Sequence, residues 1–259
     1  MRFFLGRKDP DRGAEVDPPF IAAPFDTSGA FPEDRTFRDR TFRGMRADGG
    51  IVEGMAAFKC TFEGCWIGMR DRSDRRTIIR NVALIDCHAR GFMSGPAIFE
   101  NVLVDGLTTS NLPIFEAPAF RHVVLRGKLG RIMVSHVHST VAPKSERPAF
   151  QEANRRFYAE VDWALDITEA EFTEADLRGI PGHLVRRDPA TQVLVRRERL
   201  LDRRWQNLFT DSWIAVACEL MLEDGRESEV LVAAKRSRNF ERDVKWLRQL
   251  REAGIADAD

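Results

Sequence analysis

The stretch that decides the fold reads Cys60-Thr-Phe62-Glu-Gly-Cys65-Trp-Ile67-Gly-Met. It consists of two consecutive five-residue units, and each unit places a smaller apolar residue two positions before a larger one. Residues 165–179 repeat this arrangement three times, with the larger residues at Ile167, Phe172 and Leu177. An α-helix spaces its apolar residues by three and four positions, and a β-strand alternates them by two. A period of five fits neither element alone.

A second and longer period lies over the first. One series of large apolar residues has spacings of 20, 22, 20 and 21, and its members are Phe42, Phe62, Leu84, Val104 and Leu125. The smaller partners that precede the last four members are Cys60, Val82, Val102 and Val123. Another series, spaced by 21, 21, 20 and 21, consists of Phe37, Phe58, Ile79, Phe99 and Phe120. Four units of five make about one such period. The pattern predicts a coil with four short sides, stacked on the next coil at the strand spacing of about 4.8 Å.

Glycine and asparagine positions agree with corners between these sides. Three glycines closely follow inward residues, as expected where the chain turns sharply, and they are Gly64, Gly106 and Gly127. Asn81, Asn101 and His122 also recur at the coil period. We expect their side chains to form a hydrogen-bonded ladder between coils.

The units Cys60–Gly64, Ala170–Glu174 and Ala175–Gly179 resemble pentapeptide repeats, whose family pattern is A(D/N)Lxx. The resemblance covers about residues 36–182, and the middle coils depart from the pattern with Val in place of Ala and one-residue insertions. It implies a mainly β fold, a right-handed parallel β-helix built as a quadrilateral solenoid. It implies little about activity, because most members act by presenting a surface. The predicted core ladder is Cys60, Phe62, Val82, Leu84, Val102, Val104, Val123 and Leu125.

Segments outside the repeat suggest three parts. Residues 1–35 are rich in proline and predict an irregular arm over the first coil. Residues 36–182 form the solenoid, with a short helix looping out near 140–158. Residues 183–259 carry apolar residues at helical spacing and predict an α-rich cap over the C-terminal edge. The cap is alternatively a homodimerisation element, for which three tryptophans are suited: Trp205, Trp213 and Trp246.

Composition predicts a cytoplasmic protein without nucleic-acid or membrane partners. The 40 basic residues equal the 40 acidic ones, so no overall charge favours a polyanion. The longest apolar run, from Trp213 to Leu222, is too short to span a bilayer. Charged residues follow soon after Met1, so the apolar segment there is too short to be the core of a signal peptide. Four cysteines form no disulfide-dense framework, which fits a reducing compartment.

No metal or cofactor is predicted. A zinc site could be suspected from three cysteines and a histidine, namely Cys60, Cys65, Cys87 and His88. The cysteines, however, occupy the inward small-residue positions of the repeat units, and their spacing is not that of a structural zinc site. They are better explained as core residues. His136 and His138 lie on the same side of a predicted strand and are weak metal candidates, since two ligands alone make no site.

Charged clusters offer one weak binding candidate. Residues 70–76 contain four arginines that could hold an acidic partner or a phosphate, namely Arg70, Arg72, Arg75 and Arg76. Arginines interleaved with aspartates are more often a solvated surface. Residues 160–176 contain seven acidic residues. Some pentapeptide-repeat proteins mimic DNA and occupy type II topoisomerases, but here the acidic stripe covers one coil and the middle of the predicted solenoid is basic.

These observations predict a non-catalytic scaffold that presents a flat β-helix face, or its α-rich cap, to a protein partner. A quadrilateral coil has a filled interior and flat sides, which leave little concavity for a substrate. The alternative is a β-helix enzyme that acts on a carbohydrate or phosphoester through carboxylates of residues 160–176. A deep cleft with two opposed carboxylates would favour that alternative.

Overall fold

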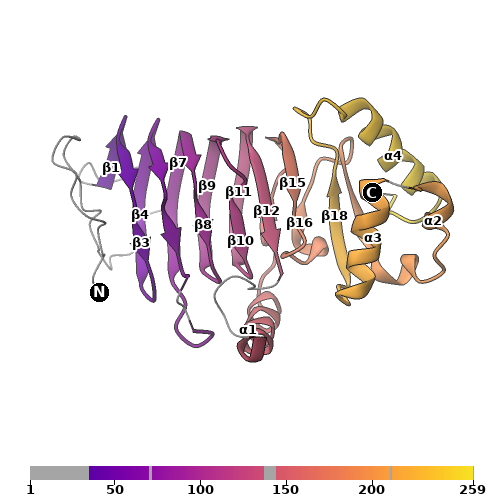
Figure 1. The fold of residues 1–259 in the computed structure, drawn as a ribbon, viewed down its shortest axis with the longest axis horizontal. Coiled ribbons are helices and arrows are strands. Elements are labelled where there is room, and N and C mark those ends of the chain that lie inside the picture. The colour runs from indigo at the N-terminus through magenta and orange to yellow at the C-terminus, as the bar shows by residue number, and fades with distance from the viewer. Residues whose placement is uncertain (1–34, 70–71, 137–143, 211, 259) are drawn as a thin grey trace.

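The computed structural model describes residues 35–69, 72–136, 144–210 and 212–258. Within these residues the protein is mainly β, with long parallel sheets and a smaller helical part at its C-terminal end (Figure 1). The predicted N-terminal arm, residues 1–35, lies outside them except for its last residue.

The parallel strands fall into successive levels, which we number along the chain. Level 1 contains β1 (Thr36–Arg38), β2 (Thr41–Arg43) and β3 (Arg46–Ala47), and level 2 contains β4 (Ile51–Phe58), β5 (Thr61–Glu63) and β6 (Trp66–Ile67). Level 3 contains β7 (Ile78–Arg90) and β8 (Met93–Ser94), and level 4 contains β9 (Ile98–Thr109) and β10 (Ile114–Glu116). Level 5 contains β11 (Ala119–Leu129) and β12 (Arg131–Ser135). Level 6 contains β13 (Leu165–Asp166), β14 (Ala170–Glu171) and β15 (Glu174–Asp176), and β16 (Val185–Arg186) follows it.

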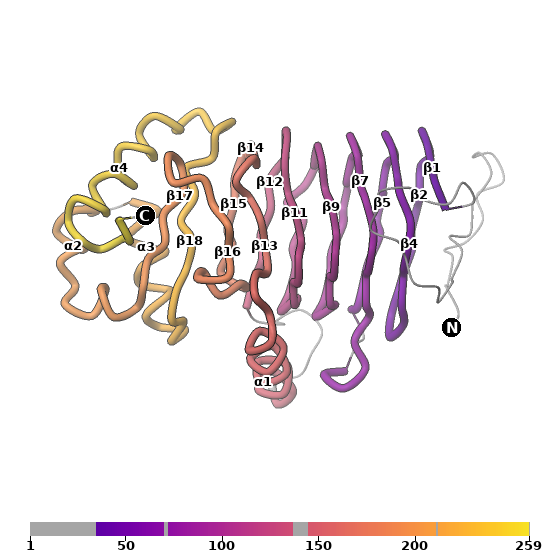
Figure 2. Tube along the Cα trace, turned by 180° about the vertical axis from the view of Figure 1, so that it is seen from behind, coloured from indigo at the N-terminus to yellow at the C-terminus, as the bar shows by residue number. Residues whose placement is uncertain are grey.

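Each strand pairs in parallel with strands of the neighbouring levels. One sheet has the order β1-β4-β7-β9-β11-β13-β16, and a second sheet has the order β3-β6-β8-β10-β12-β15. Paired residues are 20 or 21 positions apart at many levels, as for Thr41 with Thr61 and Phe99 with Phe120. This arrangement is compatible with a parallel β-solenoid, because chain order and spatial order are the same in both sheets (Figure 2).

The register between levels 2 and 3 differs from the predicted one. Leu84 pairs with Ala57, and Phe62 pairs with Ala89, so the spacing between partners is longer here than at the other levels. The predicted column with Phe62 next to Leu84 is therefore wrong. Ala89 lies five positions after Leu84 in the chain, which is one repeat unit. A slip by one unit still places small and large apolar residues inward, so the sequence pattern does not reveal it.

The same slip moves other predicted neighbours. Val82 pairs with Met55 instead of lying in one column with Cys60. Phe58, predicted to be inward, lies outside both buried clusters of the protein and is only half-buried. The guanidinium group of Arg38 covers part of the Phe58 ring, with its central carbon 4.1 Å from the centre of the ring.

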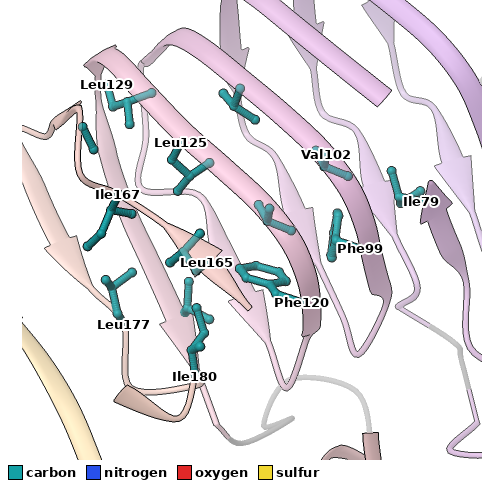
Figure 3. Close-up of a cluster of buried hydrophobic side chains, with 14 of the residues drawn as sticks. Ile79, Phe99, Val102, Phe120, Leu125, Leu129, Leu165, Ile167, Leu177 and Ile180 are labelled. Atoms are coloured by element: carbon teal, nitrogen blue, oxygen red, sulfur yellow. The ribbon is translucent and has the colours of Figure 1, made fainter. Parts of the chain in front are cut away.

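From level 3 to level 5, the structure places the other predicted residues in three inward columns. They are Ile79-Phe99-Phe120, Val82-Val102-Val123 and Leu84-Val104-Leu125. All of these side chains are buried except the half-buried Leu84. Figure 3 shows several of them pointing into one common interior. Each column continues from strand to strand, so apolar contacts run along the stack of levels.

Residues with positive φ stand at aligned positions in neighbouring levels. Asn81, Asn101 and His122 have φ values of 53°, 53° and 55°, a region that asparagine and histidine tolerate better than most residues. The Asn101 amide donates a hydrogen bond to Asn81 Oδ1 at 3.1 Å, and His122 Nδ1 lies 3.3 Å from Asn101 Oδ1. The predicted ladder is therefore present. The three predicted corner glycines also have positive φ: Gly64, Gly106 and Gly127.

A helix is inserted between levels 5 and 6. The short η2 (Lys144–Glu146) leads into α1 (Arg147–Tyr158), and the chain passes through both between the paired residues Val123 and Leu165. Phe150 is almost fully buried, and α1 projects to one side of the sheets (Figures 1 and 2). The insertion was expected near residues 140–158, of which 140–143 lie outside the described part.

The C-terminal part combines helical segments with a hairpin. Its elements are η3 (Gly182–Leu184), β17 (Gln192–Arg196), η4 (Arg197–Leu200), α2 (Trp205–Leu208), α3 (Trp213–Glu223), β18 (Ser228–Val232) and α4 (Phe240–Glu252). Strands β17 and β18 pair antiparallel and lie between the last parallel strands and the helices (Figure 1). Ser212 starts α3 as its N-cap, because its hydroxyl accepts a hydrogen bond from the Ala215 N–H at 3.2 Å. Among the described residues, no helix is long and apolar enough to cross a membrane.

Candidate functional site

The three cysteines of the repeat are core residues. Cys60, Cys65 and Cys87 are at most 2% exposed and are not in disulfides. Burial raises the pKa of the Cys65 and Cys87 thiols to about 11, which keeps them protonated and unreactive. In the described residues, no group of three or more His, Cys, Asp or Glu side chains is placed to hold a metal ion.

His88 lies on the outside of level 3 and is engaged with level 4. Its Nδ1 lies 2.8 Å from the Thr108 hydroxyl, and its Nε2 lies 2.8 Å from the Ser110 hydroxyl. The Thr108 hydroxyl donates to the Cys87 carbonyl at 3.4 Å. Both imidazole nitrogens therefore have partners, and the contacts tie adjacent levels together across the outer surface.

His136 lies at the junction between the parallel sheets and the C-terminal part. Its Nε2 is 3.5 Å from the Asp224 carboxylate, and burial lowers the pKa of its imidazole from the ordinary 6.5. His138, its predicted companion, lies outside the described residues. Arg226 pairs with Asp224 at 3.2 Å and also with Glu229. His136 thus belongs to an ionic cluster at the junction.

Glu229 is the most perturbed acid of that cluster. Only 4% of the residue is exposed, and burial raises the pKa of its carboxyl from 4.5 to about 7. The ion pair with Arg226 acts in the opposite direction and does not compensate for the loss of hydration. Strongly shifted acids are typical of functional sites and also of structural ion pairs. The partner of Glu229 is an arginine whose side chain is only 10% exposed, which indicates a structural role.

The predicted arginine site is not one convergent cluster. Arg70 lies outside the described residues. Arg72 pairs with Asp74 at 3.1 Å in a tight turn, and Arg75 is exposed. Arg76 is turned inward and donates to the carbonyl oxygens of Pro96, Ala97 and Ala117. Arg76 therefore serves internal packing, and binding of a partner by the other three arginines stays a prediction.

Arg76 also anchors the inserted helix. Its Nη1 donates to Asn154 Oδ1 at 2.6 Å, and the Asn154 amide donates to the carbonyls of Ala117 and Pro118 at 3.2 and 3.1 Å. The hydroxyl of Tyr158 accepts a hydrogen bond from a backbone N–H of β11 at 3.2 Å. These bonds hold α1 against the edge of levels 4 and 5.

Several carboxylates of residues 160–176 are bound to neighbours. Asp162 accepts from His122 Nε2 at 2.7 Å, and this hydrogen bond lowers the pKa of the Asp162 carboxyl. Arg131 Nε donates to Glu174 at 2.7 Å. Asp176 pairs with Arg178, and Asp166 caps the turn that follows it. In none of these contacts does a second carboxylate face the first.

Ion pairs between levels cover the outside of the parallel sheets. They join neighbouring levels at 2.8 to 3.2 Å, and they are Arg43–Glu63, Arg80–Glu53, Arg121–Glu100 and Arg126–Asp105. Glu53 is buried, whereas the other pairs are partly exposed, and exposed pairs contribute about 0–1 kcal/mol each. Their arrangement neutralises much of the charge on these faces, which favours a solvated surface over a polyanion site.

Apolar exposure is concentrated in the C-terminal part. Among the described residues, the three most exposed large apolar side chains are Leu201 at 58%, Leu208 at 50% and Val216 at 59%. A shallow hollow opens between α2 and α3, and Val216 lines it together with Trp205, Gln206, Phe209, Thr210, Ser212, Ala215 and Glu219. We call this feature the cap hollow. Leu201 and Leu208 are not among its lining residues, so of these three exposed side chains Val216 is the one that borders the hollow.

Of the tryptophans predicted for a dimer interface, Trp205 lines the cap hollow, and Trp213 and Trp246 do not line it. Trp205 is only 2% exposed, and its indole N–H donates to the Leu200 carbonyl at 3.1 Å. The Trp213 indole donates to Asp243 at 3.1 Å, and the Arg242 guanidinium covers the Trp246 ring at 4.4 Å. Val216 was not among the predicted site residues. No sequence signal identified it, because a run that is apolar on nearly every side of a helix, as from Trp213 to Leu222, is typical of a buried helix.

Comparisons of the chain with protein-family models, with curated proteins and with solved structures found no match. The geometry of the described residues is thus the basis for a functional assignment. It offers ion-paired outer faces and a hollow on the C-terminal part that is lined by both apolar and polar residues.

Proposed function

We propose that the chain is a right-handed quadrilateral β-helix of the pentapeptide-repeat kind. Strand partners 20 or 21 positions apart and positive-φ residues at aligned positions support this proposal. Inward residues two positions apart, such as Val102 and Val104, correspond to the small and large positions of a repeat unit. The longer spacing between levels 2 and 3 is then one coil with a loop inserted in it.

We further propose that the protein is an interaction scaffold, and that a protein partner docks on the cap hollow. The observation that carries this proposal is the exposure of Val216 on α3 beside the hollow. An aliphatic side chain of a partner would fill the hollow and remove Val216 from water, at a gain of about 25 cal/mol per Å² of apolar surface. Helix α3 packs its other side into the core through Ile214, Cys218 and Met221, so the surface is held rigidly.

Rigid support distinguishes the cap hollow from a flexible segment. Its residues lie on elements that share one buried cluster with α4 and with the β17–β18 hairpin. A preformed surface loses little conformational entropy on binding, which favours affinity per unit area. The free, buried cysteines support the proposal that this scaffold works in a reducing compartment such as the cytoplasm.

The enzyme alternative receives less support. Asp162, Glu174 and Asp176 each bind a basic side chain rather than facing another carboxylate. General acid and base catalysis by two carboxylates needs them opposed across a bound substrate. The proposed scaffold requires no such pair.

The test uses affinity capture from cells of the source organism with three forms of the chain. Wild type is compared with Val216→Asp in the cap hollow and with Ile51→Asp, a matched change at an exposed residue of β4. A protein retained by wild type and by Ile51→Asp but lost with Val216→Asp supports the proposal, provided that the purified pair then associates in solution. Loss with Ile51→Asp alone would assign the interface to the β face instead. Capture of further copies of the chain alone would identify a homodimer.

A further inference from the structure

A cavity of about 170 Å³ lies inside the stacked levels. Its lining includes residues of every level, from Met45 in level 1 to Phe172 in level 6. Most lining side chains are apolar, and many of them belong to the inward columns, such as Val102, Val104 and Leu125. The cavity is therefore bounded mainly by the residues that form the core, and the exposed Trp66 also belongs to its lining.

The residue types on the inward columns explain why space remains there. The central levels place Val82, Val102, Val104 and Val123 inward, and Ala89 stands opposite Phe62. Valine and alanine are smaller than the leucine and phenylalanine that occupy the corresponding positions elsewhere in the chain. Each wall is a continuous hydrogen-bonded sheet, so it cannot bend inward at one level to fill the space left by a smaller side chain without disturbing the pairing with the next level.

The cavity is long and narrow. Its lining extends over six levels, and a strand spacing of about 4.8 Å gives it a length on the order of 20 Å. A volume of about 170 Å³ distributed over such a length leaves little width. This shape accommodates an unbranched chain and excludes a fused ring system of the same number of atoms.

We propose that this cavity binds an unbranched hydrocarbon chain. Apolar cavities of comparable size in other proteins stay free of water and bind small apolar molecules, because water finds no hydrogen-bond partners there. A chain in the cavity makes dispersion contacts with side chains that otherwise face empty space. This binding site is internal and distinct from the cap hollow, so it neither requires nor excludes the proposed scaffold function.

The experiment measures uptake of n-decane by the purified full chain, with decalin as the probe of equal carbon number and fused-ring shape. Headspace gas chromatography gives the bound amount, and thermal unfolding gives the stabilisation. We expect one n-decane per chain and a rise in Tm of roughly 3 °C when free n-decane exceeds its Kd about tenfold. Decalin should bind at least tenfold more weakly.

Two variants locate the binding. Val104→Phe places a ring in the cavity and should weaken n-decane binding at least tenfold, whereas Val124→Phe, on the outer side of β11, should leave it unchanged. Val104→Leu, a smaller change, serves if the phenylalanine variant fails to fold, and it should weaken binding as well. The proposal is overturned if wild type takes up no n-decane, if decalin binds equally, or if the folded Val104 variants bind like wild type.

Discussion

Replacing Phe120 by alanine tests the register of the inward columns. Phe120 is 3% exposed, and its ring lies edge-on to Phe99 with 5.3 Å between centroids. Truncation of a buried phenylalanine removes its transfer free energy and leaves a cavity, at a cost of about 3–5 kcal/mol. The matched control is Phe58→Ala. The longer period of the sequence assigns Phe58 to the same column as Phe120, but the structure places it outside the core.

The expected cost of Phe58→Ala is much smaller. Its ring is half-buried and mainly loses the contact with Arg38, which contributes about 0.5–1 kcal/mol. Both variants are compared with wild type by urea unfolding, followed by far-UV circular dichroism and by tryptophan fluorescence. Repeat proteins do not always unfold in one step, so the two signals must coincide before free energies are compared. Equal destabilisation by the two substitutions would refute the shifted register between levels 2 and 3.

Three further predictions concern polar groups. The folded pKa of Glu229, about 7, exceeds its ordinary 4.5, so its stabilising contribution is complete below pH 4.5 and is lost as the pH rises to 7. Glu229→Gln should abolish this decline, up to about 3 kcal/mol, in unfolding free energies measured from pH 4 to 8. Asn101→Ala should cost about 1–2 kcal/mol in urea unfolding, because Asn81 loses its ladder partner. Asn154→Ala should release α1 from Arg76 and speed hydrogen exchange of that helix alone. A pH profile retained in Glu229→Gln, unchanged stability in Asn101→Ala, or unchanged exchange in α1 would contradict the respective prediction.

The sequence predicted the inward columns where each level has nearly the same length. Ile79, Phe99 and Phe120 are separated by one level each, and their strands pair directly. Prediction failed between Phe62 and Leu84, where a segment added between β6 and β7 lengthens the level, so that Phe62 pairs with Ala89. Because the repeat unit is five residues long, any error of one unit exchanges one inward position for another. Only hydrogen-bond pairing distinguishes these alternatives.

The candidate site was less predictable, because side chains were assigned by type rather than by direction. Arginine suggests binding of acidic groups, yet Arg76 turns inward to backbone carbonyls of the next levels. Tryptophan suggests an interface, yet Trp205 is part of the helical core. Val216 has no chemistry that singles it out in the sequence. Its importance comes from facing water on a helix whose opposite side is buried, and only packing establishes that.

The β17–β18 hairpin links the two buried clusters of the protein. Leu194 and Val230 pack into the cluster that fills the stacked levels, whereas Val193 and Leu231 pack into the cluster under the helices. Alternate side chains of a strand point to opposite faces, so one two-stranded sheet contributes to both clusters. If the C-terminal part separated from the levels, one apolar face of the hairpin would therefore become exposed, whether the hairpin stayed with the levels or with the helices. Movement of the cap hollow relative to the levels requires breaking these contacts, so a partner bound there is held in a fixed orientation to the outer faces.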